Sequence, residues 1–147
     1  MDDAPSPQTA RLVLIVDDDR AVRESASRLL ADEGFASAGF ADGIEALEAV
    51  RAGLRPAVIL LDITMPRMDG WDFRNAQRAD PVLRDVPVVI VTATGFSEAT
   101  IRLQFGEVPV LRKPLQPGEL LETIARLVGR PEAPERPRDV PSPTPVG

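Results

Sequence analysis

The sequence predicts one α/β domain built on a doubly wound, five-stranded parallel sheet with helices on both faces. Two observations indicate this fold. Short, mostly apolar runs, typical of strands buried on both faces, alternate with amphipathic segments of helical spacing. The chain has 147 residues, 44% of them hydrophobic and 27% charged, which is enough for one domain with its own hydrophobic core.

The N-terminal half is expected to contain the first three strands. Leu12–Val16 and 57–61 are unbroken apolar runs of strand length, whereas 35–40 is a weaker strand of mixed residues. A helix from about Arg20 connects the first two strands, because apolar residues recur along one of its faces, and Gly34 ends it.

Two helices flank the third strand. Asp42 is expected to cap the helix before it, since Glu45 follows three places later, which is the spacing of a capping box. Gly53 closes that helix, and residues 71–78 form a short helix after the strand.

The C-terminal part is expected to add two strands and two helices. The strands cover 88–91 and 108–111, and the helix between them, 97–105, is weak because its apolar face is reduced mainly to Ile101 and Phe105. The final helix carries five apolar residues at helical spacing: Leu120, Leu121, Ile124, Leu127 and Val128.

The two ends differ in composition from the middle. Residues 1–10 and the proline-rich residues 131–147 are expected to be disordered, which leaves 11–130 as the folded unit. The N-terminus lacks the basic and apolar regions of a secretion signal, and no apolar run reaches the roughly 20 residues of a membrane helix. We therefore expect a cytoplasmic protein without membrane contact.

The composition excludes several kinds of chemistry. The chain has no cysteine and no histidine, so thiol nucleophiles, imidazole bases and zinc sites of the usual ligands are ruled out. Carboxylate, hydroxyl and carbonyl oxygens remain, and these suit a hard cation such as Mg²⁺. The net charge of −6, without a basic tract, makes direct binding of nucleic acid unfavourable.

Polar residues follow the expected strands at their carboxyl ends. The acidic run 17–19 follows the first strand, Asp62 the third, Thr92 the fourth and Lys113 the fifth. Because parallel strands end at one edge of the sheet, these groups are expected to meet in one crevice. Loop and cap preferences explain any single one of them, and Asp19 is best explained as a helix N-cap. They do not explain the combination.

This combination of groups suits phosphoryl transfer. Neighbouring carboxylates repel one another, and a divalent cation and a lysine relieve that repulsion. The same cation and lysine would stabilise charge on a transferring phosphoryl group, and a carboxylate is able to act as the nucleophile.

Four segments resemble the receiver domain of bacterial two-component response regulators. They are 12–19, with the first strand and acidic pair; 60–70, with the acceptor strand and its loop; 87–93, with the strand that ends in a hydroxyl residue; and 113–114, with a Lys-Pro pair. The match extends over most of 11–130, in the order and spacing of the family. It implies a CheY-like, that is flavodoxin-like, arrangement of the sheet.

The resemblance implies that Asp62 becomes phosphorylated with Mg²⁺ bound beside it. The implied metal ligands are Asp17, Asp18, Asp62 and the backbone carbonyl of Thr64. We favour Asp18 as the direct ligand of the acidic pair, with Asp17 acting through water.

The resemblance also implies the groups that bind the phosphoryl group and switch with it, namely Thr92, Ala93 and Lys113, and a cis peptide bond between Lys113 and Pro114. One position departs from the family. An aromatic residue usually stands three places before the lysine, where this chain has Val110, and the chain contains no tyrosine.

The departure at Val110 puts the usual aromatic read-out in doubt. Phe96 and Phe105 are alternatives, although core packing suits both better, and the loop 94–96 is another. Thr64 and Thr94 stand two places after Asp62 and Thr92, and we expect them to tune the lifetime of the phosphate by controlling access of water.

The function implied is a signalling switch, not an enzyme beyond its own phosphorylation and dephosphorylation. A sensor histidine kinase or a histidine phosphotransfer protein must donate the phosphate, because this chain has no histidine. A downstream protein is expected to bind the face formed by 97–128, and a homodimer is a further expected partner arrangement. Phosphorylation would favour a pre-existing active conformation.

Three other functions were weighed. An aspartate-nucleophile phosphohydrolase needs a second aspartate at position 64, where this chain has threonine. A flavin-binding module needs a glycine-rich phosphate loop and no acidic crevice. A receiver-like scaffold that is never phosphorylated has no need of the intact acidic set.

Overall fold

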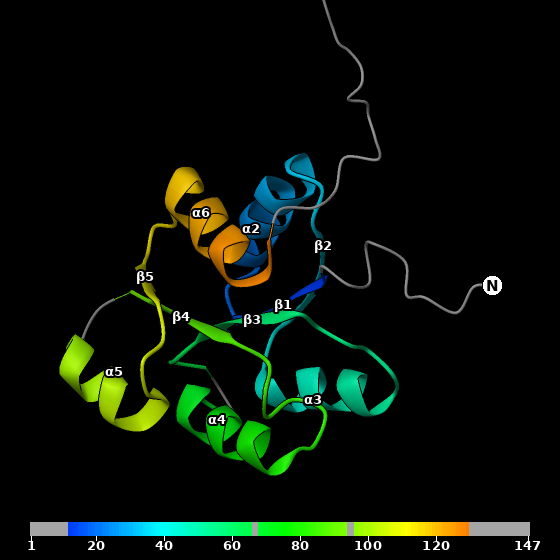
Figure 1. Ribbon diagram of the computed structural model, residues 1–147, viewed down its shortest axis with the longest axis vertical. Coiled ribbons are helices and arrows are strands. Elements are labelled where there is room, and N and C mark those ends of the chain that lie inside the picture. The colour runs from blue at the N-terminus through cyan, green and yellow to red at the C-terminus, as the bar shows by residue number, and fades with distance from the viewer. Residues whose placement is uncertain (1–11, 66–67, 94–95, 130–147) are drawn as a thin grey trace, which may run out of the picture.

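The computed structural model describes residues 12–65, 68–93 and 96–129, and these form one five-stranded parallel sheet with helices on both faces (Figure 1). The strand order is β2-β1-β3-β4-β5. The strands are β1 (Leu12–Val16), β2 (Ala36–Phe40), β3 (Val58–Asp62), β4 (Val88–Thr92) and β5 (Val110–Arg112). The helices are α2 (Arg20–Asp32), α3 (Gly43–Arg51), α4 (Gly70–Ala79), α5 (Glu98–Phe105) and α6 (Pro117–Val128). The predicted fold class is confirmed.

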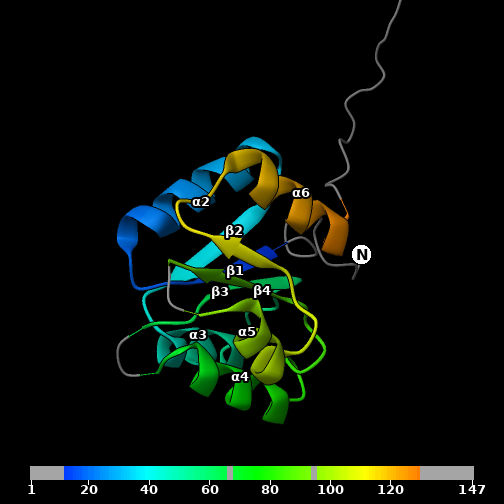
Figure 2. The ribbon, with the colours of Figure 1, turned by 90° about the vertical axis from the view of Figure 1, so that its left-hand side faces the viewer.

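The sheet separates two hydrophobic cores. Helices α2 and α6 cover one face, and α3, α4 and α5 cover the other, as two perpendicular views show (Figures 1 and 2). Successive residues of a strand point to opposite faces, so Val13 joins the core under α2 and α6 while Leu14 joins the other. This explains why the central strands are apolar at every position. Each fully buried Val, Leu or Ile contributes about 1.5–3 kcal/mol to folding.

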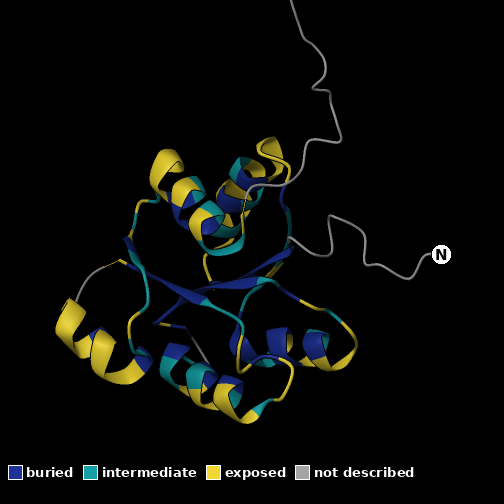
Figure 3. Cartoon of the chain, viewed as in Figure 1, coloured by how far each residue is buried: buried dark blue, intermediate teal, exposed yellow. Residues whose placement is uncertain are grey.

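Burial is concentrated in the sheet and in the inner faces of the helices. Figure 3 shows the central strands buried throughout, whereas the outer faces of the helices are exposed. All five residues of β1, β3 and β4 are buried. The strand ends on these buried elements are therefore fixed in space, which matters for the polar side chains they carry.

Most expected elements form within a few residues of their expected bounds, and two differences bear on the site. β3 and β4 each extend by one residue, so that Asp62 and Thr92 are the last residues of their strands, with Asp62 paired with Val91. β5 begins at Val110 instead of 108, because Pro109 has no N–H to donate to the sheet.

The two expected disordered ends, 1–10 and 131–147, lie outside the described residues. Within the part of the chain that the structure describes, no helix combines the length and apolar character needed to cross a membrane.

Candidate functional site

A crevice opens at the carboxyl ends of the strands. Its volume is about 530 Å³. It brings together most of the polar residues that the sequence analysis placed there, and its lining consists of Asp18, Asp19, Asp62, Thr64, Thr92, Ala93 and Lys113. Residues far apart in the sequence thus meet because parallel strands all end at the same edge.

Three carboxylates form a compact cluster at this edge. One oxygen from each of Asp17, Asp18 and Asp62 lies within 4.8 Å of the others. Asp17 and Asp62 are buried, at 2% and 4% exposure, whereas Asp18 is exposed to the crevice. Buried carboxylates this close together are costly unless cations compensate them.

The loop 17–19 is fixed by its own hydrogen bonds. The Asp17 N–H donates to the carbonyl of Phe40 on β2 (3.1 Å), and the Asp19 N–H donates to the Asp17 Oδ1 atom (2.9 Å). The Asp19 carboxylate accepts from the N–H of Ala21 (2.9 Å), one of the unpaired donors of the first turn of α2. The expected N-cap role of Asp19 is confirmed, and it turns the loop so that Asp18 faces outward.

Asp62 is held by the loop that follows it. The Thr64 N–H donates to Asp62 Oδ1 (3.2 Å). The loop returns so closely that the Gly70 N–H donates to the carbonyl of Ile63 (2.6 Å). A Cβ atom on residue 70 would lie 2.7 Å from the Cα of Ile63 and 2.9 Å from the backbone oxygen of Asp62, so only glycine fits there.

Lys113 directly follows β5, an edge strand of the sheet, and its side chain reaches the carboxylates beside β1 and β3. Its Nζ atom lies 3.0 Å from Asp17 Oδ2 and 3.5 Å from Asp62 Oδ2, and its side chain is only 18% exposed. Its backbone N–H donates to the carbonyl of Thr92 (2.9 Å), and the peptide bond to Pro114 is cis, as expected. One ammonium group therefore bridges the two buried carboxylates.

The electrostatics of the cluster follow from burial and repulsion. Burial first, and then the Asp17 carboxylate, raise the pKa of Asp62 from 3.8 to about 7, although Lys113 opposes this. Burial alone lowers the pKa of Lys113, but its hydrogen bond to Asp17 and its attraction to both carboxylates outweigh that effect, and the pKa is raised. Lys113 therefore stays charged at neutral pH, whereas the Asp62 carboxyl is only partly ionised there. This combination indicates that the acidic cluster lacks positive charge.

The donor set fits Mg²⁺. The three carboxylate oxygens are hard ligands of the kind that Mg²⁺ prefers, and they lie beside an open crevice. Both Asp17 oxygens already accept hydrogen bonds or ion pairs, from Asp19 and Lys113, whereas Asp18 projects into the crevice. This supports Asp18 as the direct ligand, but that assignment and the Thr64 carbonyl stay predictions.

The hydroxyl residue of β4 takes its expected place. Thr92 is buried at the last position of the strand and lines the crevice together with exposed Ala93. Of the two threonines expected to flank the phosphate, Thr64 lines the crevice. Thr94 lies outside the described residues, as does Gly95.

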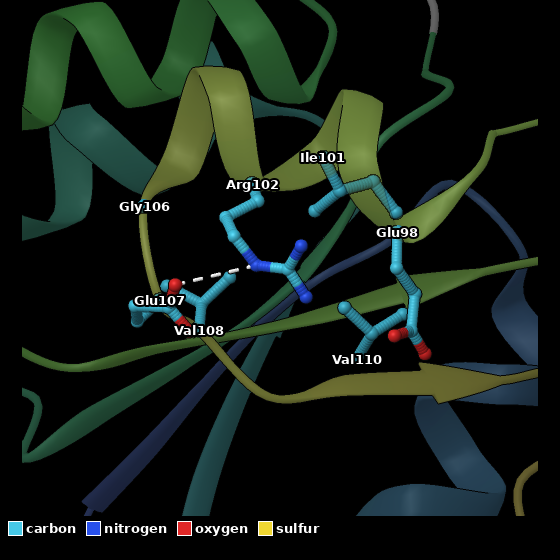
Figure 4. Close-up of a pocket in the computed structure, with 7 residues that line it drawn as sticks. All are labelled: Glu98, Ile101, Arg102, Gly106, Glu107, Val108 and Val110. Atoms are coloured by element: carbon cyan, nitrogen blue, oxygen red, sulfur yellow. Dashed lines mark ion pairs between the residues drawn. The ribbon is translucent and has the colours of Figure 1, made fainter.

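A small hollow of about 90 Å³ lies beside Val110, the position where the sequence departs from the family pattern (Figure 4). It is lined by α5, by the loop after α5 and by β5, and the ion pair from Arg102 Nε to Glu107 Oε2 (3.3 Å) joins two of its lining residues. The residues around it are Glu98, Ile101, Arg102, Gly106, Glu107, Val108 and Val110. A small side chain at 110 leaves this space without an aromatic ring.

The two phenylalanines considered as alternatives pack on the single tryptophan instead. Trp71 of α4 meets Phe96 edge-on, with ring centroids 5.5 Å apart, and Phe105 at a tilt, with centroids 4.9 Å apart. Phe105 is 1% exposed, and Phe96 packs against the same core. The interpretation of both as core residues is supported.

One contact at the site was not foreseen. Arg23 of α2 donates from Nη1 to the backbone carbonyl of Asp17 (2.8 Å). The only signal in the sequence is an arginine in the first turns of the helix that follows the acidic loop, a pattern that many exposed helices share.

Comparison with known proteins agrees with this geometry. Residues 13–125 match the family model described as the response regulator receiver domain. The DNA-binding response regulator MtrA of Mycolicibacterium paratuberculosis is 40% identical over 117 residues, which is 78% of this chain and 50% of MtrA. Response regulator MprA of a Mycobacterium species is 38% identical over 126 residues, or 85% of this chain and 54% of MprA.

Solved structures show the same likeness. The chemotaxis protein CheY4 of Vibrio cholerae superposes with a TM-score of 0.71 at 33% identity, over 79% of this chain and 97% of CheY4. The receiver domain of the Francisella response regulator 1452 gives a TM-score of 0.70 at 28% identity, over 80% and 96% of the two chains.

The chain spans about half the length of the curated relatives it matches. The name of MtrA describes DNA binding by that longer protein. For this chain, the expectation that it makes no direct contact with nucleic acid therefore stays a prediction.

Proposed function

The chain belongs to the response regulator receiver family, and on that premise we propose that Asp62 accepts a phosphoryl group in a Mg²⁺-dependent transfer from a phosphohistidine. The donor would be a sensor histidine kinase or a histidine phosphotransfer protein, acting in the cytoplasm. The acyl phosphate would then switch the binding of another protein. Members of this family are signalling switches.

The observation that carries this proposal is the surroundings of one carboxylate. Asp62 ends a fully buried strand, lies within 4.8 Å of the carboxylates of Asp17 and Asp18, and has the ammonium group of Lys113 at 3.5 Å. It also lines an open crevice that admits a phosphoryl group. A purely structural ion pair has no need of a third carboxylate beside the pair or of an open crevice.

In the proposed step, an Asp62 oxygen attacks phosphorus, an O–P bond forms and the P–N bond to the imidazole of the donor breaks. The electron pair of that bond stays on the imidazole, which takes a proton. When bound, Mg²⁺ supplies positive charge to the transferring phosphoryl oxygens. The half-buried ammonium group of Lys113 adds a second cation, which holds Asp17 and Asp62 together despite their repulsion.

Protonation bears directly on this nucleophile. With a pKa of about 7, a large part of Asp62 is protonated at neutral pH when no metal is bound, and a protonated carboxyl is a poor nucleophile. A cation beside Asp18 would lower that pKa and release the carboxylate for attack. The acidic cluster thus gives a physical reason for the proposed metal dependence.

The chain would act as a switch instead of a turnover enzyme. Thr64, two places after Asp62 and exposed in the crevice, offers no carboxylic acid to protonate a leaving group, so phosphohydrolase turnover gains no support. The Thr92 hydroxyl and Ala93, at the end of β4, are proposed to contact the phosphoryl oxygens.

The test is phosphorylation by a small donor. Wild type, Asp62→Asn and Asp19→Asn are incubated with acetyl phosphate, with Mg²⁺ or with EDTA, and their intact masses are measured. Asn is as good an N-cap as Asp, so Asp19→Asn is a control that removes a nearby charge but keeps α2.

We expect one phosphoryl adduct on wild type and on Asp19→Asn, only with Mg²⁺, and none on Asp62→Asn. The adduct should be lost in hydroxylamine, as an acyl phosphate is. An equal adduct on Asp62→Asn would overturn the proposal.

A further inference from the structure

Arg23 is a second cation beside the acidic loop, and neither the resemblance nor the acceptor chemistry assigns it a role. Its Nη1 atom donates to the carbonyl oxygen of Asp17 at 2.8 Å, and the side chain is half-buried. The contact joins α2 to the loop that carries two of the three clustered carboxylates.

The sheet leaves a place for this arginine. The stem of Arg23 lies across Gly39 of β2, where a Cβ atom would be 3.3 Å from the Arg23 Cδ atom. β2 ends at Phe40, which accepts from the Asp17 N–H. The guanidinium therefore supplies a donor to the Asp17 carbonyl just beyond the end of the neighbouring strand.

The position of Arg23 complements that of Lys113. In the strand order, β2 and β5 are the two edges of the sheet, and the acidic cluster lies between them, just after β1 and at the end of β3. Arg23 approaches from the β2 side and holds the backbone of Asp17, whereas Lys113 comes from the β5 end and contacts its carboxylate. One cation fixes the main chain and the other the side chain.

We propose that Arg23 is a positioning residue that holds the backbone of Asp17, and with it Asp18, in the geometry that binds Mg²⁺. This inference rests on the proposed function, because it deepens the account of the same site. Residues that orient metal ligands without touching the metal typically contribute 10- to 100-fold to metal affinity. Without the arginine, the loop that carries Asp17 and Asp18 would lose a hydrogen bond that holds it in place against the repulsion among the three carboxylates.

The test compares Arg23→Ala and Arg23→Lys with Arg28→Ala. Arg28 is a matched control. It is also on α2, and together with Arg23 and Gly39 it lines a groove between α2 and β2, but it is exposed. Mg²⁺ binding is measured by calorimetry without any phosphodonor. Exchange of the Asp19 amide, which donates to Asp17 Oδ1, is measured by NMR in EDTA. Circular dichroism checks that each variant is folded.

We expect roughly tenfold weaker Mg²⁺ binding in Arg23→Ala, faster exchange of the Asp19 amide, and wild-type behaviour of Arg28→Ala. Arg23→Lys, whose side chain is one bond shorter, should lie between wild type and Arg23→Ala. At saturating Mg²⁺, phosphorylation of Arg23→Ala by acetyl phosphate should approach the wild-type rate, because the side chain of Arg23 does not line the crevice.

Two results would overturn the positioning role: Mg²⁺ affinity of Arg23→Ala within twofold of wild type, or an equal loss in Arg28→Ala. Wild-type Mg²⁺ affinity in Arg23→Lys would mean that the charge of residue 23 supports Mg²⁺ binding and its hydrogen bond to the Asp17 carbonyl does not. That result would also contradict the positioning role. These failures leave the proposed function intact, since wild type would still be phosphorylated on Asp62. Failure of wild type to accept phosphate would instead sink the proposed function.

Discussion

The acidic crevice and the hollow beside Val110 lie on the same domain but are built in opposite ways. In the crevice, Asp17 and Asp62 are buried, each has a defined hydrogen-bond partner, and one lysine bridges them. Around the hollow, α5 has a weak apolar face, and the side chains of Arg102 on α5 and of Glu107 just after it are largely exposed. The groups of the acidic cluster thus lie mainly at buried strand ends, whereas the charged groups around the hollow face solvent.

The difference also bears on how a signal would leave the site. The family usually has an aromatic residue at the position of Val110, and here that residue is small. Ring contacts instead join Trp71 of α4 to Phe96, just before α5, and to Phe105, the last residue of α5. In addition, Arg74 of α4 donates to the carbonyl of Phe105 at 2.7 Å. Helix α4 therefore follows the acceptor loop in the chain and packs against the end of α5.

A large effect on stability is expected at the crevice. Gly70→Ala places a Cβ atom 2.7 Å from the Cα of Ile63, so the acceptor loop must move. We expect a loss of about 1–3 kcal/mol in the free energy of unfolding, measured in urea. Gly118→Ala, in the first turn of α6 with no atom within 4 Å of its Cβ, is the control and should be neutral or stabilising. Equal losses in the two variants would contradict the tight loop.

A pair of identical substitutions compares the buried sheet with the hollow. Val91→Phe overfills β4, where Val91 is 2% exposed, and should cost about 1–3 kcal/mol. Val110→Phe has the hollow of about 90 Å³ beside it and should cost less than about 1 kcal/mol. Urea unfolding of both variants measures the difference. If Val110→Phe is the more damaging, the hollow is not available to a ring.

Much of the crevice, and little of the hollow, could be predicted from the sequence. Buried strands and carboxylates at their ends follow local rules, so Asp62 and the acidic run 17–19 could be placed before any coordinates. The bond from Arg23 to Asp17 could not, because it depends on how α2 lies across Gly39. The start of β5 and the packing of Trp71 likewise depend on tertiary contacts.

The pH dependence of stability is expected to trace to Asp62. Between its ordinary pKa of 3.8 and its raised value of about 7, the folded protein keeps a proton that the unfolded chain has lost. Stability of the metal-free protein should therefore fall as pH rises through this window. Melting temperatures in EDTA should drop by a few degrees more in wild type than in Asp62→Asn between pH 5 and pH 8.

The exposed control for that experiment is Asp19→Asn, which should follow wild type. Added Mg²⁺ should restore stability more at pH 8 than at pH 5, because the carboxylate must be ionised to bind. A melting temperature of wild type that is independent of pH would mean that Asp62 is not strained by its neighbours.

The smallest expected effect on stability lies on the outer side of α5. Leu103 is 85% exposed, so Leu103→Lys should change the free energy of unfolding by less than about 0.5 kcal/mol. Ile101→Ala, two residues away but 1% exposed, should cost about 2–5 kcal/mol. A large loss in Leu103→Lys would show that this surface is covered in solution, for example by a second copy of the chain.

The claim on which all of this depends is that the Asp62 carboxylate is the phosphoryl acceptor. It is tested most directly by treating the phosphorylated protein with borohydride, which reduces an aspartyl phosphate to homoserine, and sequencing the peptides by tandem mass spectrometry. The account predicts homoserine at position 62 after incubation with acetyl phosphate and Mg²⁺, and aspartate in the EDTA control. Homoserine at 17 or 18, or an adduct that leaves residue 62 unreduced, would contradict it.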